Sequence, residues 1–185
     1  MNSIQKERKL NRLKEYDYSK CGYYFVTICI IRGVEYFGKI DNEKMVLNQY
    51  GKIAQEYWSE IPNIYDKVEI DEFIIMPNHI HGIIIIQEND NKRTEQCSVP
   101  TNTESGYGLL SKVIKSFKNA VTKKNRQELG VNNFQWQRSF YDHVIRNEKS
   151  LYEIRKYIIN NPLKWDLEKN NIENLPSILC SNSKK

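Results

Sequence analysis

The sequence predicts an α+β fold built on an antiparallel sheet, and three observations lead to this prediction. Short runs rich in β-branched and aromatic residues alternate with stretches in which apolar residues recur every three or four positions. Short connections join several of the strand-like runs, which favours hairpins. The chain has 185 residues, 39% of them hydrophobic and 28% charged, and this composition fits one globular domain with a real core.

The first elements are two strands and a helix. Residues 23–31 and 34–40 are rich in β-branched and aromatic types, and only two residues separate them, so we expect them to pair as a hairpin. Asn48 is placed to cap a helix, because its side chain can accept a hydrogen bond from the first turn. Pro62 is expected to end that helix.

A second hairpin follows. Residues 68–76 and 79–87 are strand-like and are joined only by Pro77 and Asn78. Proline fixes φ near about −65° and asparagine tolerates positive φ, so this pair favours a tight turn. The return strand is apolar on both sides apart from its histidines, which predicts a central strand covered on both faces.

The last elements are a helix over residues 109–124, a strand over 139–145 and a final helix. Ser150 and Glu153 have the spacing of a capping box, which predicts the start of that helix, and it should end near Asn161. Five strands in this order with helices between them indicate an antiparallel sheet of the ferredoxin-like kind, with two helices on one face. The final helix is the expected cover of the other face.

One domain is predicted to span residues 1–185. Residues 1–20 are expected to form a basic arm, residues 88–108 a polar and mobile loop, and residues 171–185 a tail.

Charge and composition narrow the functional class. The net charge of +5 favours polyanionic partners. The four cysteines have neither CxxC nor zinc-finger spacing, so we expect a reducing, cytoplasmic environment. No apolar leader and no run of about 18 to 20 apolar residues is present, so no membrane segment is expected.

The most informative residues are His79 and His81. Alternate side chains of a strand point to one face, so both imidazoles project together from the most apolar segment of the chain. Two neutral imidazoles suit a divalent metal, whereas two protonated ones would repel each other. The alternative is a pair of hydrogen-bonded strand histidines, and a third ligand is needed to favour the metal.

Tyr157 and Asn161 are four residues apart on the final helix and therefore share a face. The neighbouring apolar seam comprises Leu151, Ile154 and Ile158. If this seam packs on the histidine-bearing face of the sheet, the Asn161 amide is placed to be the third ligand and the Tyr157 hydroxyl to be a nucleophile. The alternative is an ordinary tyrosine of an amphipathic helix.

Four segments together resemble the REP-associated tyrosine transposases, which are single-tyrosine transposases of the HUH (His-hydrophobic-His) superfamily. These segments are residues 16–28, 76–81, 136–146 and 157–165. Each is weak alone, but their order and spacing are specific, and the likeness spans about residues 16–165.

The resemblance implies an RRM-like palm and a metal-dependent endonuclease and strand transferase that acts on single-stranded DNA through a 5′-phosphotyrosine. It implies Mg²⁺ or Mn²⁺ on His79, His81 and Asn161, with Tyr157 as the nucleophile. Related transposases carry glutamine at the position of Asn161, which makes this ligand the least secure. The implied substrate is an imperfect palindrome folded as a hairpin, bound by a monomer or a homodimer.

Basic residues are the expected DNA contacts. The arm offers Arg8, Lys9, Arg12 and Lys14, and one face of the helix over residues 109–124 offers Lys112, Lys115 and Lys118. The expected stacking residues are Trp136, Tyr141 or Trp165. A solvated helix face is the alternative for the three lysines. His143 is left out of the ligand set.

Two other functions are compatible with the sequence. One is a non-catalytic or domesticated RRM-like nucleic-acid-binding protein, which gives no reason for the histidine pair. The other is a metal-dependent nuclease that uses water, which predicts no covalent adduct between protein and DNA.

Overall fold

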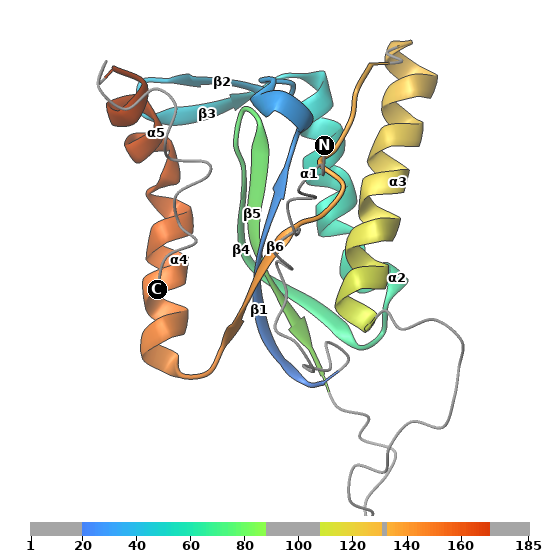
Figure 1. Cartoon of the computed structure of the whole chain (residues 1–185), viewed down its shortest axis with the longest axis vertical. Coiled ribbons are helices and arrows are strands. Elements are labelled where there is room, and N and C mark those ends of the chain that lie inside the picture. Colours follow the sequence, from blue (N-terminus) through green and yellow to red (C-terminus); the bar gives the residue numbers. More distant parts are fainter. Residues whose placement is uncertain (1–19, 88–107, 131–132, 171–185) are drawn as a thin grey trace, which may run out of the picture.

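The computed structural model describes residues 20–87, 108–130 and 133–170 (Figure 1). Apart from Lys20 and Gly108, the predicted arm, loop and tail lie outside these residues.

The main sheet has four antiparallel strands in the order β4-β5-β1-β6. These strands are β1 (Gly22–Cys29), β4 (Val68–Ile75), β5 (His79–Ile86) and β6 (Tyr141–Ile145). The predicted hairpin of β4 and β5 is confirmed. β5 is central and has apolar cover on both faces, as its residue pattern predicted.

The predicted first hairpin is wrong. Both edges of β1 are taken by β5 and β6, while β2 (Gly38–Asp41) and β3 (Lys44–Leu47) pair with each other in a separate small sheet. A short 3₁₀ turn, η1 (Ile31–Gly33), redirects the chain after β1, and its last two residues have positive φ angles of 57° and 66°. The chain then runs along the turn between β4 and β5 instead of returning along β1.

The helices on one side of the sheet are α1 (Gln49–Ser59), α2 (Ile61–Ile64) and α3 (Leu109–Leu129). The predicted cap of α1 is confirmed, because the Asn48 side chain accepts a hydrogen bond from Gly51 N at 3.1 Å. Pro62 lies in the first turn of α2, where its missing N–H costs nothing. α3 is longer than predicted and ends at Gly130, which is left-handed.

The C-terminal helices are α4 (Glu148–Ile159) and α5 (Asn161–Asn170). The predicted capping box is wrong, since Asn147 caps α4 by accepting a hydrogen bond from Ser150 N at 2.8 Å. Pro162, expected near the helix end, is instead the second residue of a further helix. Tyr157 and Asn161 therefore belong to different helices.

Helices cover both faces of the sheet (Figure 1). α1 and α3 enclose the larger core, and α4 covers a smaller cluster made of Phe25, Ile83, Ile145, Leu151 and Ile158. Trp58 of α1 lies so close to Gly82 of β5 that a Cβ there would be 2.3 Å from the indole. The predicted α+β class, with helices on one face and a C-terminal helix on the other, is confirmed. In the described parts, no helix combines the length and hydropathy needed to span a membrane.

Candidate active site

The two histidines of β5 meet under α4. They are only 6% exposed, and their Nε2 atoms are 3.0 Å apart. Each has a partner on its other ring nitrogen: His79 Nδ1 lies 2.7 Å from Asn78 Oδ1, and His81 Nδ1 lies 2.8 Å from Thr27 Oγ1. The two Nε2 atoms thus point toward each other, and each Nδ1 atom contacts a polar side chain on the opposite side of its ring.

Burial makes this pair neutral. It lowers the pKa of His79 to about 4. Burial, and then the charge of His79, hold the pKa of His81 well below its ordinary value. At neutral pH both imidazoles are therefore uncharged, which is the form that binds a metal ion.

The spacing of the Nε2 atoms fits a shared metal ion. Two ligand atoms at about 2.1 Å from one cation, at right angles to each other, are about 3.0 Å apart. The observed separation is 3.0 Å. Within the described residues no group of three or more His, Cys, Asp and Glu side chains is placed to hold a metal.

Tyr157 of α4 reaches the histidine pair. Its hydroxyl oxygen lies 3.4 Å from His81 Nε2, and its ring packs nearly perpendicular to that of Phe25, with centroids 6.1 Å apart. The side chain is 38% exposed, so the hydroxyl group is held by packing but remains open to a ligand. Lys164 Nζ lies 4.9 Å from the centre of the phenol ring. The apolar seam of α4 packs on the histidine-bearing face, as the sequence indicated.

Asn161 is buried at the start of α5. Trp165, four residues later on the same helix, packs on His79 with ring centroids 5.5 Å apart. Because residues four apart share a helix face, Asn161 lies on the side of α5 that faces the histidines. Its role as third ligand stays a prediction.

The predicted DNA-binding lysines lie away from this cluster. α3 is on the other side of the sheet from α4 (Figure 1). Lys112 and Lys115 are exposed there, whereas Lys118 donates hydrogen bonds to the backbone oxygens of Gln137 and Ser139 at 2.9 and 3.0 Å. Lys118 therefore holds the segment that precedes β6. The four basic residues of the arm lie outside the described residues.

The three candidate stacking residues have different surroundings, and Trp165 is the one that packs on His79. Trp136 packs against Phe37, Phe117 and Phe134, and its indole N–H donates to Lys118 O at 3.1 Å, so it is a core residue. Tyr141 is 49% exposed and aligns with Thr27 across the sheet.

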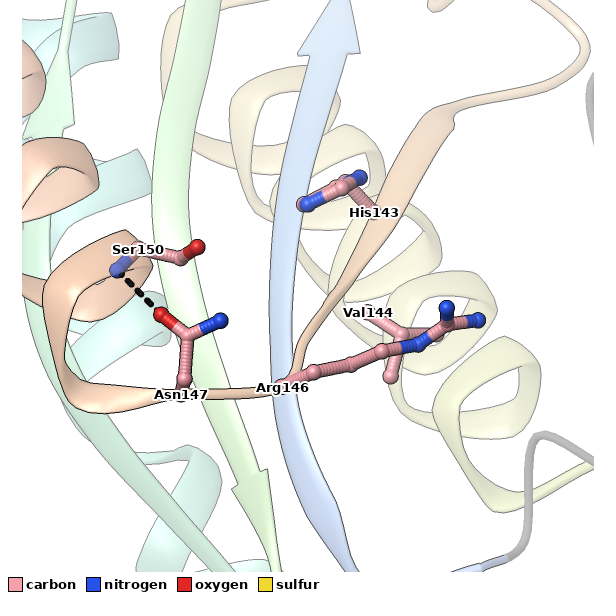
Figure 2. A pocket seen from close by; sticks show the side chains of 5 residues that line it. All are labelled: His143, Val144, Arg146, Asn147 and Ser150. Carbon is pink, nitrogen blue, oxygen red and sulfur yellow. Dashed lines mark hydrogen bonds between the residues drawn. The ribbon is translucent and has the colours of Figure 1, made fainter.

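His143 does not join the histidine pair. It is exposed on β6 and lines a hollow of about 360 Å³ with Val144, Arg146, Asn147 and Ser150 (Figure 2). None of the residues that line this hollow belongs to the His79, His81 and Tyr157 cluster.

Sequence reasoning missed Thr27 and Asn78. Thr27 is found only through the register in which it pairs with His81, and no local pattern reveals that register. Asn78 was assigned to the turn, and its position next to His79 was the available signal.

Comparison with known proteins finds similar sequences. No family model matches the chain. A Haemophilus influenzae protein described as "Uncharacterized protein" is 38% identical over 169 residues, which are 86% of this chain and 90% of the relative. A second protein of that organism, described as "Putative REP-associated tyrosine transposase", is 28% identical over 148 residues, which are 80% of this chain and 74% of the relative. The chain is thus similar in sequence to a protein described as a REP-associated tyrosine transposase.

The fold is also similar to that of a solved structure. A solved structure described as a REP-associated tyrosine transposase bound to a REP hairpin covers 86% of this chain and 77% of its own, with 21% identity and a TM-score of 0.54. At this identity the likeness concerns the fold alone.

Proposed function

We propose that this protein is a REP-associated tyrosine transposase that cleaves and rejoins single-stranded DNA at hairpin-forming palindromic repeats, with Tyr157 as the nucleophile. One observation carries the proposal: the Tyr157 hydroxyl oxygen is 3.4 Å from a buried imidazole pair whose Nε2 atoms converge to 3.0 Å. The name of a relative and the hairpin bound to a protein of the same fold support this class of substrate.

His79, His81 and Asn161 would hold Mg²⁺ or Mn²⁺. Such a cation draws negative charge from a nonbridging phosphate oxygen and orients the phosphate for in-line displacement. The neutral state of the two histidines and the spacing of their Nε2 atoms support this assignment.

The reaction at Tyr157 is an exchange of one phosphate ester for another. The phenol oxygen attacks phosphorus, the bond to the 3′ oxygen breaks, and a 5′-phosphotyrosine and a free 3′-hydroxyl group result. Water takes the phenol proton and supplies the proton of the 3′-hydroxyl group. A free phenol has a pKa of about 10, so the ammonium group of Lys164 beside the ring assists by favouring the phenolate.

The ester link to Tyr157 conserves the energy of the broken phosphodiester. A 3′-hydroxyl group of another strand can therefore attack the phosphotyrosine and release the tyrosine without ATP. This return step distinguishes a strand transferase from a nuclease that uses water, whose product cannot be rejoined in the same way.

The test is the replacement of Tyr157 by phenylalanine. Tyr157→Phe removes one oxygen and keeps the ring that packs on Phe25, so folding and DNA binding should survive while cleavage is lost. Tyr152→Phe is the matched control, since Tyr152 is on the same helix but 63% exposed. The substrate is a hairpin oligonucleotide from the flanks of the gene, labelled on the 3′ side of the cut and analysed on a denaturing gel.

Wild type and Tyr152→Phe should give a protein-linked band, and Tyr157→Phe should give none. Continued cleavage by Tyr157→Phe without an adduct would replace the proposal with a nuclease that uses water. Binding without cleavage by the wild type would indicate a non-catalytic protein.

A further inference from the structure

Asn78 has an orientation that the structure determines. Its side-chain N–H donates to Gly33 O at 3.0 Å, so its Oδ1 is the atom that faces His79 Nδ1 at 2.7 Å. A carbonyl oxygen only accepts hydrogen bonds. The proton of neutral His79 is therefore on Nδ1, and its Nε2 always carries a lone pair.

Thr27 imposes no such restriction on His81. A hydroxyl group can donate or accept, so the 2.8 Å contact between Thr27 Oγ1 and His81 Nδ1 suits either neutral form of the ring. In the metal-free protein, two lone pairs would repel each other across the 3.0 Å between the Nε2 atoms. His81 Nε2–H therefore donates to His79 Nε2, and the Thr27 hydroxyl donates to His81 Nδ1.

We propose that Asn78 and Thr27 are positioning residues with different tasks: Asn78 locks His79 in one tautomer, and Thr27 lets His81 change tautomer when a divalent cation binds. The inference rests on the proposed function, because it requires a cation at the pair. On binding, His81 must offer its Nε2 lone pair. Its Nε2 proton leaves to water, Nδ1 takes a proton from water, and the Nδ1–H then donates to Thr27 Oγ1, so no net proton is released.

The irregular segment after β1 supports this assignment. Arg32 and Gly33 have positive φ angles, and this conformation brings the Gly33 carbonyl to the Asn78 amide. The same segment is tied to the turn by hydrogen bonds from Ile30 N to Asn78 O at 2.9 Å and from Phe37 N to Pro77 O at 3.0 Å. The turn that presents His79 is thus fixed through its backbone as well as through the amide.

The first test reads the tautomers directly. Long-range ¹H–¹⁵N correlation spectra of the imidazoles should show His79 with its proton on Nδ1 in the metal-free protein and His81 with its proton on Nε2. Saturation with Mg²⁺, which is diamagnetic, should move only the His81 proton to Nδ1. A His79 ring protonated at Nε2, or a His81 ring already protonated at Nδ1 without metal, would overturn the inference.

The second test is a titration of Mn²⁺ followed by electron paramagnetic resonance. Loss of a partner behind a metal-binding histidine typically weakens the metal by about 10- to 100-fold, and this is the expected effect of Thr27→Val and Asn78→Leu. Thr27→Ser keeps a hydroxyl group at this position and should stay close to wild type. Thr122→Val is the matched control, because that hydroxyl donates to Lys118 O on the far side of the sheet.

The outcomes separate the inference from the proposed function. Equal Mn²⁺ affinity in folded Thr27→Val, Asn78→Leu and wild type would overturn the inference and leave the metal site standing. A wild type that binds no Mn²⁺ would overturn the metal site together with the change of tautomer at His81. If Asn78→Leu fails to fold, the spectra of the wild type still show whether His79 is held in the Nδ1-protonated tautomer.

Discussion

At the scale of residues, the site depends on ring packing as much as on ligand chemistry. Phe25 stacks on His81, with centroids 5.4 Å apart and planes 25° from parallel, and presents its face or edge to Tyr157. One apolar side chain thus contacts both the metal-binding candidate His81 and the candidate nucleophile Tyr157. Because rings are rigid, this contact fixes the tyrosine relative to His81 without a strong hydrogen bond.

The metal ligands can be ranked by mutation. His79→Ala and His81→Ala should abolish Mn²⁺ binding and DNA cleavage while leaving DNA binding largely intact, because each removes one of two convergent nitrogens. Asn161→Ala should weaken Mn²⁺ binding less, since an amide oxygen on a separate helix is the more replaceable ligand. Isothermal titration with Mn²⁺ measures both effects.

His143→Ala is the control for these variants, because His143 is exposed on the same sheet and outside the cluster. Unchanged Mn²⁺ affinity in both histidine variants of β5 would refute the assignment of the ligands.

The alternation of side chains along a strand was sufficient to place His79 and His81 on one face. It was not sufficient to find Thr27, since that contact depends on which residue of β1 pairs with β5. The neutral state of the pair also follows from burial, which the sequence indicates only through the isoleucines around it.

At the scale of elements, one ion pair fastens α4 to β4. Arg155 donates to Asp71 through Nη2 at 2.6 Å and through Nε at 3.0 Å. Asp71 lies at the irregularity of β4 between Ile70 and Phe73, where pairing with β5 shifts. The irregularity therefore places a carboxylate beneath the helix that carries Tyr157.

Breaking this ion pair should affect cleavage more than stability. The Arg155 side chain is 41% exposed and that of Asp71 14%, and pairs at the surface contribute about 0.2 to 1 kcal/mol, so a double-mutant cycle of Arg155→Met and Asp71→Leu in urea should give a coupling near the upper end of that range. The rate of single-turnover cleavage should fall in both variants, because Tyr157 is two residues from Arg155.

Lys124→Met offers a comparison, since it breaks the exposed pair with Glu128 on α3, on the far side of the sheet. If it slows cleavage as much as Arg155→Met does, the pair with Asp71 has no specific role in placing Tyr157.

The start and end of the C-terminal helices show where local signals mislead. Both Asn147 and Ser150 are good caps, and the choice between them depends on where β6 ends. A proline two residues after the break at Asn160 equally suits a helix end or a helix start. The packing of α5 against β2 and β3 favours the start of a new helix here. These two strands are more than 100 residues away in the sequence, so no local pattern reveals the contact.

At the scale of the whole molecule, the basic residues are divided between the two sides of the sheet. Lys112 and Lys115 are on α3, while Lys156 and Lys164 are on the side of Tyr157.

The order of strands in the main sheet could not be predicted from local sequence patterns, because the partners of β1 are β5 and β6, which are far along the chain.

The salt dependence of DNA binding tests the α3 lysines. If both contact phosphate, Lys112→Gln with Lys115→Gln should reduce the slope of log affinity against log salt by about 0.7 per contact for single strands. Lys118→Gln should instead lower the melting temperature, because its ammonium group holds two backbone oxygens. Fluorescence anisotropy with a labelled hairpin at several salt concentrations gives the slope.

Lys44→Gln on β3 is the control, since this lysine is exposed on the small sheet. An unchanged slope in the double variant would show that the α3 lysines form only a solvated face.

The two faces of the sheet also differ in how strongly substitutions on them should affect folding. The side chains that fold the protein are concentrated between the sheet and α1 and α3, whereas the reactive groups lie on the opposite face beside a small apolar cluster. A lineage of this protein can therefore lose the hydroxyl group of Tyr157 and still inherit an intact fold. Descendants that no longer cleave DNA should keep the residues that pack on α1. Substitutions should accumulate first at His79, His81 and Tyr157.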